Sequence, residues 1–468
     1  MTTSIVGNCG LSMAPLSEEY REEARQYQKA FLPKNNEYPW DWSSLSEFWS
    51  YALENGMRHN LAPLVGQGSI RIAVKGFDPS PATKEEMDEM KSLLQKEIRA
   101  GAFGLSSGLI YPPGSYTSTD ELLELSTVLR EEGGIYASHL RSEGDRLVEA
   151  TKEAILIGEK NRIPVELSHH KAVCRNNWGK VNETLRLMEE ARTAGVDVAC
   201  DVYPYPAAMT TVTSLLPSEA LSGGISSMLQ RLGDPEARVK IQESISSGTM
   251  KEENWILGIG WEKIVIAECG AAARYEGMSL EEIIAERDPK SPYASFFDWM
   301  LEVKGEATMI TFGMDETDVQ TVLQHRLSSV ISDSWVTAPR AGGHPHPRGY
   351  GSFPRFLGRY VRDKKMMPLE EGVRKMTSLP ANRMRIYDRG ILRPGVFADI
   401  VIFDREKIID RATFSEPHQY PEGIRYVMVN GKVVVKGNTL TGKRPGRVLK
   451  NNFKIWLNER GGWKNGTA

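Results

Sequence analysis

The segments Ile135-Tyr136-Ala137-Ser138-His139 and Ile163-Pro164-Val165-Glu166-Leu167-Ser168-His169 decide the predicted fold. Both are short, mainly apolar runs that end in a histidine, and the two histidines are 30 residues apart. That distance fits one βα unit, and residues 145–161 between them predict a helix. We therefore expect two neighbouring parallel strands joined by a right-handed crossover, with both imidazoles at one mouth of the sheet.

The alternation of strand and helix continues on both sides of this unit. Capping boxes at Thr83-x-x-Glu86 and Ser118-x-x-Glu121 predict two helix starts, because the hydroxyl and the carboxylate of each box satisfy free backbone amides. The whole pattern predicts seven parallel strands, at residues 4–7, 62–65, 102–106, 135–139, 163–169, 196–200 and 329–332.

A (β/α)8 barrel needs eight parallel strands, one more than the pattern provides. We predict an α/β fold of this class, a TIM-like barrel missing its first strand, and expect that strand to belong before residue 1. A doubly wound open sheet with seven strands is the alternative. The barrel is favoured because residues of the metal-ligand type end different strands, which is where barrel enzymes place their sites.

Two further regions depart from the alternation. Residues 214–307 contain short helix-like stretches, and we interpret them as a lid-like insertion into a barrel domain of residues 1–384. Residues 385–468 predict a small, incomplete β-sandwich-type domain followed by a C-terminal tail. Within it, residues 426–435 predict a hairpin around a type I′ Asn430-Gly431 turn.

Composition excludes several classes of partner. The 468 residues carry a net charge of −3 without any block of like charges, which argues against nucleic acid and anionic membranes. No apolar run approaches the roughly 18 residues of a membrane span, and no signal peptide is recognisable. The four cysteines form no CxxC pair and predict a reducing, cytoplasmic location. The sequence is silent on oligomeric state.

Cys9, His139 and His169 end three of the predicted strands and are candidate metal ligands. Two imidazoles and a thiolate suit Zn²⁺, and three protein ligands leave a fourth position for water. Taken singly, either histidine would be interpreted as a core residue and the cysteine as a buried apolar side chain. Two histidines at successive strand ends, each with polar neighbours, favour the metal site.

Asp333 ends the last predicted strand. A carboxylate there can accept the proton of a metal-bound water and return it to a leaving amine, although a helix-capping or loop aspartate is an equal alternative. The segment 104–108 (GLSSG) matches a nucleophile elbow, but Tyr111-Pro112-Pro113 follows where the elbow needs a helix, which argues against a serine hydrolase. His344-Pro345-His346 imitates an HxH metal pair, yet no apolar run precedes it and we predict a loop.

Seven segments together resemble the D-aminoacylase (N-acyl-D-amino-acid deacylase) family of the amidohydrolase superfamily. The resemblance covers essentially the whole chain, and the motifs agree in order and spacing. The segments are 6–12 (VGNCGLS), 107–111 (SGLIY), 137–143 (ASHLRSE), 167–171 (LSHHK), 201–205 (DVYPY), 344–348 (HPHPR) and 392–399 (LRPGVFAD).

The resemblance implies a role for each candidate residue. Cys9, His139 and His169 would bind one tightly held zinc ion, Asp333 would be the catalytic acid and base, and Tyr111 would polarise the scissile carbonyl. The α-carboxylate of the substrate would be bound by Lys171, Tyr203 and Arg348. The implied reaction is the hydrolysis of an N-acyl-D-amino acid, a small molecule, to a carboxylate and a free D-amino acid. The family's HxH pair, which belongs to a second and weaker metal position on the first strand, has no counterpart here.

Two other functions remain open from the sequence. One is a different amidohydrolase, such as a dihydropyrimidinase-like cyclic amidase or a dipeptidase. Lys171 and Arg348 argue against the cyclic amidase, because a cyclic amide offers no free carboxylate. The other is a truncated remnant or binding protein that retains the motifs without turnover.

Overall fold

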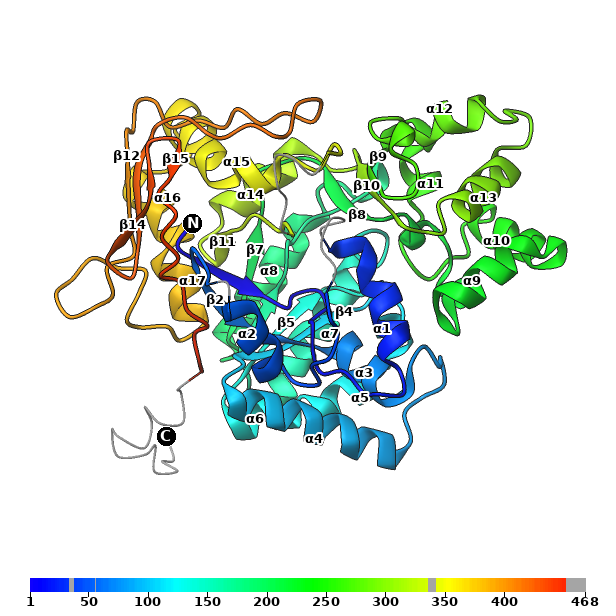
Figure 1. Ribbon diagram of the computed structural model, residues 1–468, viewed down its shortest axis with the longest axis horizontal. Helices are drawn as coiled ribbons and strands as arrows, with labels where there is room; N and C mark the ends of the chain where they lie inside the picture. The colour runs from blue at the N-terminus through cyan, green and yellow to red at the C-terminus, as the bar shows by residue number, and fades with distance from the viewer. Residues whose placement is uncertain (33–37, 55, 336–341, 452–468) are drawn as a thin grey trace.

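A parallel sheet forms the centre of the computed structural model, which describes residues 1–32, 38–54, 56–335 and 342–451 (Figure 1). β1 pairs with β2, and the order of the other central strands is β11-β7-β6-β5-β4-β3, with every pairing parallel. The strands are β1 (Thr3–Val6), β2 (Asn60–Pro63), β3 (Val65–Gly66), β4 (Gly104–Gly108), β5 (Ile135–His139), β6 (Val165–Leu167), β7 (Val198–Val202) and β11 (Ser328–Val330).

β2 and β3 occupy one strand position that is interrupted at Leu64. The Leu64 N–H donates to the Val6 carbonyl at 2.8 Å, and the Phe103 N–H donates to the Pro63 carbonyl at 2.8 Å, so this position joins β1 to the start of β4. The sheet thus has seven positions, and β1 and β11 are its edges in the part of the chain described. The described strands form the predicted TIM-like barrel sheet, which is open between β1 and β11 because closure would require these two edges to be paired.

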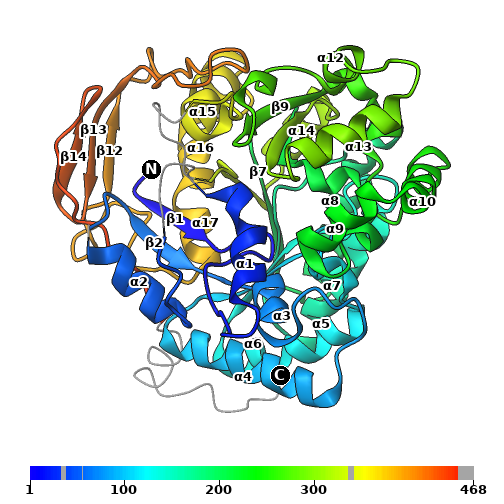
Figure 2. The ribbon, with the colours of Figure 1, turned by 45° about the vertical axis from the view of Figure 1, so that its right-hand side comes forward.

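Helices lie around the outside of the sheet (Figure 2). The predicted capping boxes at Thr83 and Ser118 are both present and start α4 and α5. Leu105, Tyr136 and Val165 are fully buried in the core beneath the helices. The helices are α1 (Arg21–Gln28), α2 (Leu45–Glu54), α3 (Gln67–Lys75), α4 (Lys84–Ala100), α5 (Thr119–Leu125), α6 (Thr127–Glu132), α7 (Leu147–Asn161), α8 (Lys180–Thr193), α14 (Glu316–Gln324), α15 (Arg348–Arg355), α16 (Leu369–Met376) and α17 (Ser378–Arg383).

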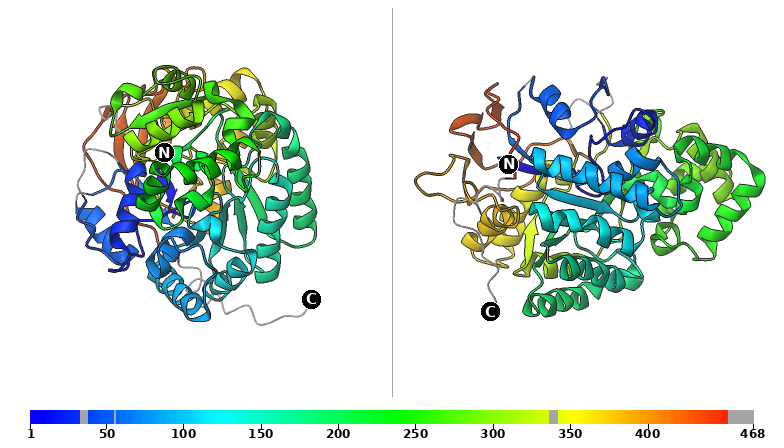
Figure 3. Two further views of the ribbon diagram at one scale, coloured as in Figure 1. Left: turned by 90° about the vertical axis from the view of Figure 1, so that its right-hand side faces the viewer. Right: turned by 90° about the horizontal axis from the view of Figure 1, so that it is seen from below.

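The chain between β7 and α14 forms a lobe that projects from the sheet (Figure 3). It holds the helices α9 (Gly224–Gly233), α10 (Pro235–Ser246), α11 (Trp255–Ile259), α12 (Leu280–Ala285) and α13 (Pro292–Glu302). It also holds an antiparallel sheet of order β8-β10-β9, formed by β8 (Ala208–Thr211), β9 (Ile264–Cys269) and β10 (Ala307–Thr311). The sequence predicted the helices but not these three strands. The lid role of residues 214–307 stays a prediction.

A four-stranded antiparallel sheet follows the barrel. Its strands are β12 (Ile400–Phe403), β13 (Ile424–Val429), β14 (Lys432–Lys436) and β15 (Thr439–Leu440). Asn430 and Gly431 have φ values of 48° and 76°, as a type I′ turn requires, and the predicted hairpin is confirmed.

Residues near the described C-terminus return to the first strands. The Leu61 N–H donates to the Arg447 carbonyl at 2.9 Å, and the Leu449 N–H donates to the Leu61 carbonyl at 2.7 Å. The Asn60 amide donates to the Asp399 carboxylate at 2.9 Å and so ties the small sheet to the barrel. Within the described ranges, no helix combines the length and the apolar content that a membrane crossing needs.

Candidate metal centre

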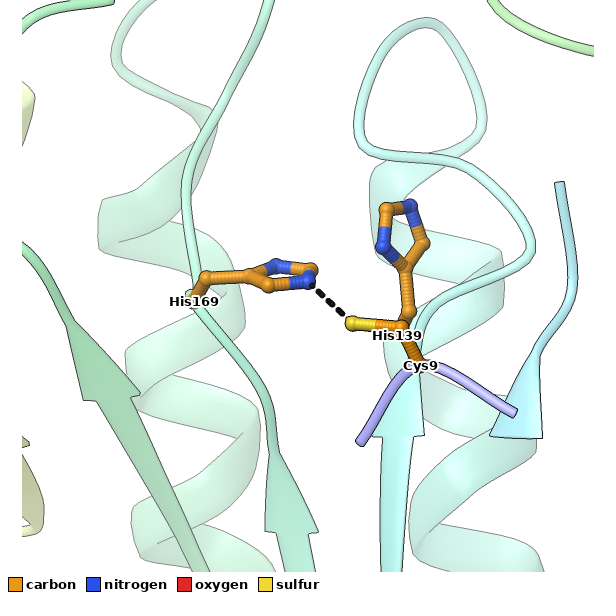
Figure 4. Close-up of side chains that lie close together, drawn as sticks. All are labelled: Cys9, His139 and His169. Carbon is orange, nitrogen blue, oxygen red and sulfur yellow. Dashed lines mark hydrogen bonds between the residues drawn. The ribbon is translucent and has the colours of Figure 1, made fainter. Parts of the chain in front are cut away.

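Three side chains with metal-binding atoms converge at the carboxyl ends of β1, β5 and β6 (Figure 4). Their donor atoms all lie within 4.8 Å of one another. The Cys9 sulfur is 3.2 Å from Nε2 of His169, and the ring centroids of His139 and His169 are 4.4 Å apart. Among the residues that the structure describes, this is the one cluster of three or more histidine, cysteine or acidic side chains that converge in this way.

The backbone is left-handed at three strand ends that surround this centre. The φ angles are 53° at Cys9, 40° at His169 and 47° at Asp333. For a residue with a Cβ atom, this conformation costs about 1–2 kcal/mol, so each side chain is held in place against local strain.

The turn that contains Cys9 packs against β4. The Ser106 hydroxyl donates to the Gly7 carbonyl at 2.5 Å and accepts the Gly10 N–H at 3.1 Å. A Cβ atom at Gly108 would lie 2.1 Å from the Cys9 carbonyl oxygen, so glycine is required where the turn crosses the strand. The GLSSG motif is therefore a strand that supports the Cys9 turn, and the prediction that it is no nucleophile elbow is confirmed.

His139 provides the clearest test of whether a metal fits. Both of its ring nitrogens are buried and lack a hydrogen-bond partner, an arrangement that costs roughly 1–3 kcal/mol for each unsatisfied group. Burial lowers the pKa of His139 well below 6.5, so the ring is neutral and keeps a free lone pair. A neutral, unpartnered imidazole beside a sulfur atom and a second imidazole is suited to bind a metal ion.

The protonation states of the other two donors also fit a cation. Burial, and next the charge on Asp333, raise the pKa of the Cys9 thiol well above 9.0. Burial, and next the charge on Lys171, lower the pKa of His169 to about 3. The protein alone therefore holds a neutral thiol and two neutral imidazoles, and only a bound cation would stabilise the thiolate. A sulfur and two nitrogens favour Zn²⁺ among common divalent ions.

Two buried cations lie next to these donors. Nη1 of Arg348 is 2.7 Å from Oδ2 of Asp333, and the guanidinium lies 4.6 Å from the centre of the Tyr203 ring. The Lys171 ammonium lies 5.8 Å from the centre of the same ring. Burial opposes the charge on Lys171, but Glu143, Tyr203 and Asp333 together outweigh this effect, and the pKa of Lys171 rises above 10.5. The structure thus brings the predicted carboxylate-binding residues and Asp333 together.

Tyr111 also packs against His139. Its ring meets the His139 ring edge-on, with centroids 5.0 Å apart, and its hydroxyl is 2.9 Å from the Thr210 hydroxyl. Burial, and next the Cys9 sulfur, raise the pKa of Tyr111 well above 10.0. The phenol is therefore an O–H donor at neutral pH.

The predicted loop at His344-Pro345-His346 is confirmed, and it supports Arg348. His346 is buried, its Nε2–H donates to the Ala207 carbonyl at 2.9 Å, and its Nδ1 accepts the backbone N–H of Arg348 at 3.0 Å. The imidazole has both nitrogens satisfied in this way and has none left for a metal.

Two carboxylates contact His169 and were not assigned a role from the sequence. Asp201 accepts the backbone N–H of His169 at 2.5 Å, and Oε1 of Glu143 lies 2.9 Å from its Nδ1. For Glu143 the sequence offered one signal, its position four residues after the candidate ligand His139, in the segment that follows β5.

Two known proteins are similar to this chain over most of its length. The D-aminoacylase of Alcaligenes xylosoxydans xylosoxydans is 34% identical over 449 residues, which are 96% of this chain and 81% of that protein. The chain belongs to the D-aminoacylase family. A second relative, the N-acyl-D-aspartate deacylase of the same organism, is 36% identical over 96% of this chain and 79% of its own length. The amidohydrolase family also matches residues 291–435.

Solved structures of the D-aminoacylase family share this fold. A D-aminoacylase described as having a binuclear metal centre has a TM-score of 0.77 at 33% identity, with 96% of this chain and 83% of that chain covered. The N-acyl-D-glutamate deacylase of Bordetella bronchiseptica, in complex with zinc and a phosphonate inhibitor, has a TM-score of 0.77 at 32% identity with the same coverage. The resemblance predicted from the sequence motifs is confirmed.

Proposed function

We propose that this protein is a zinc-dependent deacylase of N-acyl-D-amino acids, which hydrolyses the amide bond to a carboxylate and a free D-amino acid. The observation that carries the proposal is the convergence of Cys9, His139 and His169, with both His139 nitrogens unpartnered, beside the ion pair of Arg348 and Asp333. The likeness to D-aminoacylase over 96% of the chain supports the substrate class.

Cys9, His139 and His169 would hold one zinc ion. When bound, zinc lowers the pKa of a coordinated water to about 7 and so supplies a hydroxide at neutral pH. The four cysteines of the chain are free thiols, which supports a reducing compartment such as the cytoplasm.

Arg348, Lys171 and Tyr203 would bind the α-carboxylate of the substrate. An N-acyl amino acid is an anion, and a guanidinium presents two parallel N–H donors that match a carboxylate. Arg348 and Lys171 are 3% and 5% exposed, and the Tyr203 ring lies against both, so their charges act in a poorly solvated environment. A substrate held there presents its amide bond toward the three donor atoms.

Asp333 and Tyr111 would carry out the proton chemistry. Asp333 accepts the proton of the attacking water while the new C–O bond forms, and it then donates that proton to the amine nitrogen as the C–N bond breaks. The Tyr111 O–H donates a hydrogen bond to the carbonyl oxygen, where negative charge develops. Arg348 stays paired with Asp333 and fixes the orientation of its carboxylate.

An amine-release assay on the zinc-loaded protein tests the proposal. We expect hydrolysis of N-acetyl-D-amino acids, slower hydrolysis of their L isomers, and none of a dihydropyrimidine. Arg348→Ala should lower kcat/KM for the acid roughly 10- to 100-fold more than for the matching N-acetyl-D-amino acid amide, because only the acid offers the carboxylate. An unchanged preference for acid over amide refutes the substrate assignment. Near-stoichiometric zinc without turnover of any substrate would instead support a binding protein or remnant.

A further inference from the structure

We propose that Glu143 is a positioning residue of the metal centre: its carboxylate selects the His169 tautomer whose Nε2 is free to bind the metal, and it also anchors Lys171. The part that concerns Lys171 rests on the proposed function. The part that concerns His169 rests only on the three-donor centre.

Glu143 is placed to contact both residues at once. It lies in the segment between β5 and α7, and its side chain is 4% exposed. Its Oε1 is 2.9 Å from Nδ1 of His169 and 2.5 Å from the Lys171 ammonium. A carboxylate in such a position is costly to bury unless it accepts hydrogen bonds from both neighbours.

The His169 ring has two possible tautomers, and the surroundings distinguish them. Its Nε2 faces the Cys9 sulfur at 3.2 Å, while its Nδ1 faces both Glu143 and the Lys171 ammonium, the latter at 2.8 Å. If Nδ1 accepted a hydrogen bond from Lys171, the ring proton of the neutral imidazole would sit on Nε2, and no lone pair would point at the metal site. Because a carboxylate can only accept, Glu143 stabilises the tautomer with the proton on Nδ1.

Lys171 does not need the imidazole as a partner. Its ammonium donates to the carbonyl of His169 at 2.8 Å as well as to Glu143. One carboxylate oxygen therefore orients a metal ligand and a substrate-binding cation together. We infer that Glu143 couples the two halves of the site.

The backbone of Glu143 is fixed on both sides, so this geometry is preorganised. Its N–H donates to the Glu253 carboxylate, and its carbonyl accepts the N–H of Val173 at 2.9 Å. The first contact comes from the lobe between β7 and α14, and the second from the segment that follows His169. The carboxylate thus has a rigid support that does not depend on the metal.

The test compares zinc affinity, measured by chelator competition, in the wild-type protein and in Glu143→Gln. Glutamine has nearly the same shape but no charge, and its NH₂ group can donate to Nδ1 and favour the wrong tautomer. We expect zinc affinity to fall roughly 10- to 100-fold, and KM for an N-acetyl-D-amino acid to rise at saturating zinc. Glu149→Gln, an exposed carboxylate on α7, removes the same charge and should change neither value.

Loss of Glu143 leaves Lys171 buried without a counter-charge, and this alone can prevent folding. The double variant E143Q/K171M removes both charges, and circular dichroism of the metal-free protein reports whether it is folded. We expect the double variant to bind zinc at least roughly 10-fold more weakly than the wild type. Wild-type zinc affinity in either folded variant overturns the proposal. If the wild type binds zinc without deacylase activity, the proposed function fails, while the loss of zinc affinity in E143Q still supports the role at His169.

Discussion

Glu253 provides a prediction whose size follows from the structure. It lies just before α11 in the projecting lobe, its carboxylate accepts the backbone N–H of Glu143, and its other oxygen has no partner. Burial, and next the charge on Glu143, raise its pKa from 4.5 to about 7. We consider Glu253→Gln, which keeps an acceptor for the Glu143 N–H and removes the ionisation.

The sign of the effect follows from linkage. When folding raises the pKa of a carboxyl, the protonated group stabilises the native state. This contribution to the free energy of unfolding is fully present below the unfolded-state pKa and is lost as the pH rises through the native pKa. The pKa of Glu253 is 4.5 in the unfolded state and about 7 in the native state. Relative to low pH, its ionisation therefore lowers the free energy of unfolding by less than about 1 kcal/mol at pH 5 and by about 3 kcal/mol at pH 8. Glutamine does not titrate, so E253Q should gain stability relative to the wild type as the pH rises.

Urea unfolding of the zinc-loaded protein at pH 5 and pH 8 measures this gain. The difference in the free energy of unfolding between E253Q and the wild type should shift by about 2–3 kcal/mol in favour of E253Q at the higher pH. Glu243→Gln, at an exposed carboxylate on α10 of the same lobe, should show no such shift. An E253Q difference that is the same at both pH values would refute the argument that Glu253 is protonated in the native state at pH 5.

Three further predictions concern the centre and its support. Cys9→Ala should reduce bound zinc well below one ion per chain by elemental analysis, and retention of stoichiometric zinc would exclude Cys9 as a ligand. Asp333→Asn should lower kcat about 10²- to 10⁴-fold with zinc content unchanged, as expected for loss of a general base, and kcat near the wild-type value would remove that role. Arg383→Met should destabilise the fold by about 3 kcal/mol in urea unfolding, because it leaves the Glu166 carboxylate, 3.0 Å away and 12% exposed, without this counter-charge. The double variant E166Q/R383M should recover most of that loss, and no recovery would contradict the pairing.

Local signals in the sequence predicted much of the fold. The capping boxes at Thr83 and Ser118 and the Asn430-Gly431 turn are short-range features, and all three are present. The strand bounds were less accurate: β4 was expected at residues 102–106 and begins at Gly104. The reason is that α4 ends against Gly101 and the chain needs further residues to reach the sheet.

Long-range contacts could not be predicted from one sequence. β8 pairs with β10 about a hundred residues later in the chain, and no local pattern specifies that pairing. The contact between Glu143 and Glu253 likewise joins the barrel to the lobe. The candidate ligands were recognisable because His139 and His169 end successive strands, whereas the carboxylates that orient His169 reach it through tertiary structure.

The left-handed backbone at Cys9, His169 and Asp333 sets thermostability against catalysis at these three positions. Glycine would relieve the strain at each of them, with a gain of about 1 kcal/mol or more, but it would delete the side chain that the site needs. Variants selected for heat resistance alone are therefore expected to accumulate glycine or asparagine there, with loss of zinc at Cys9 and His169 and loss of activity at Asp333. Selection that retains activity must instead find its stabilising changes away from these strand ends, for example on the outer helices.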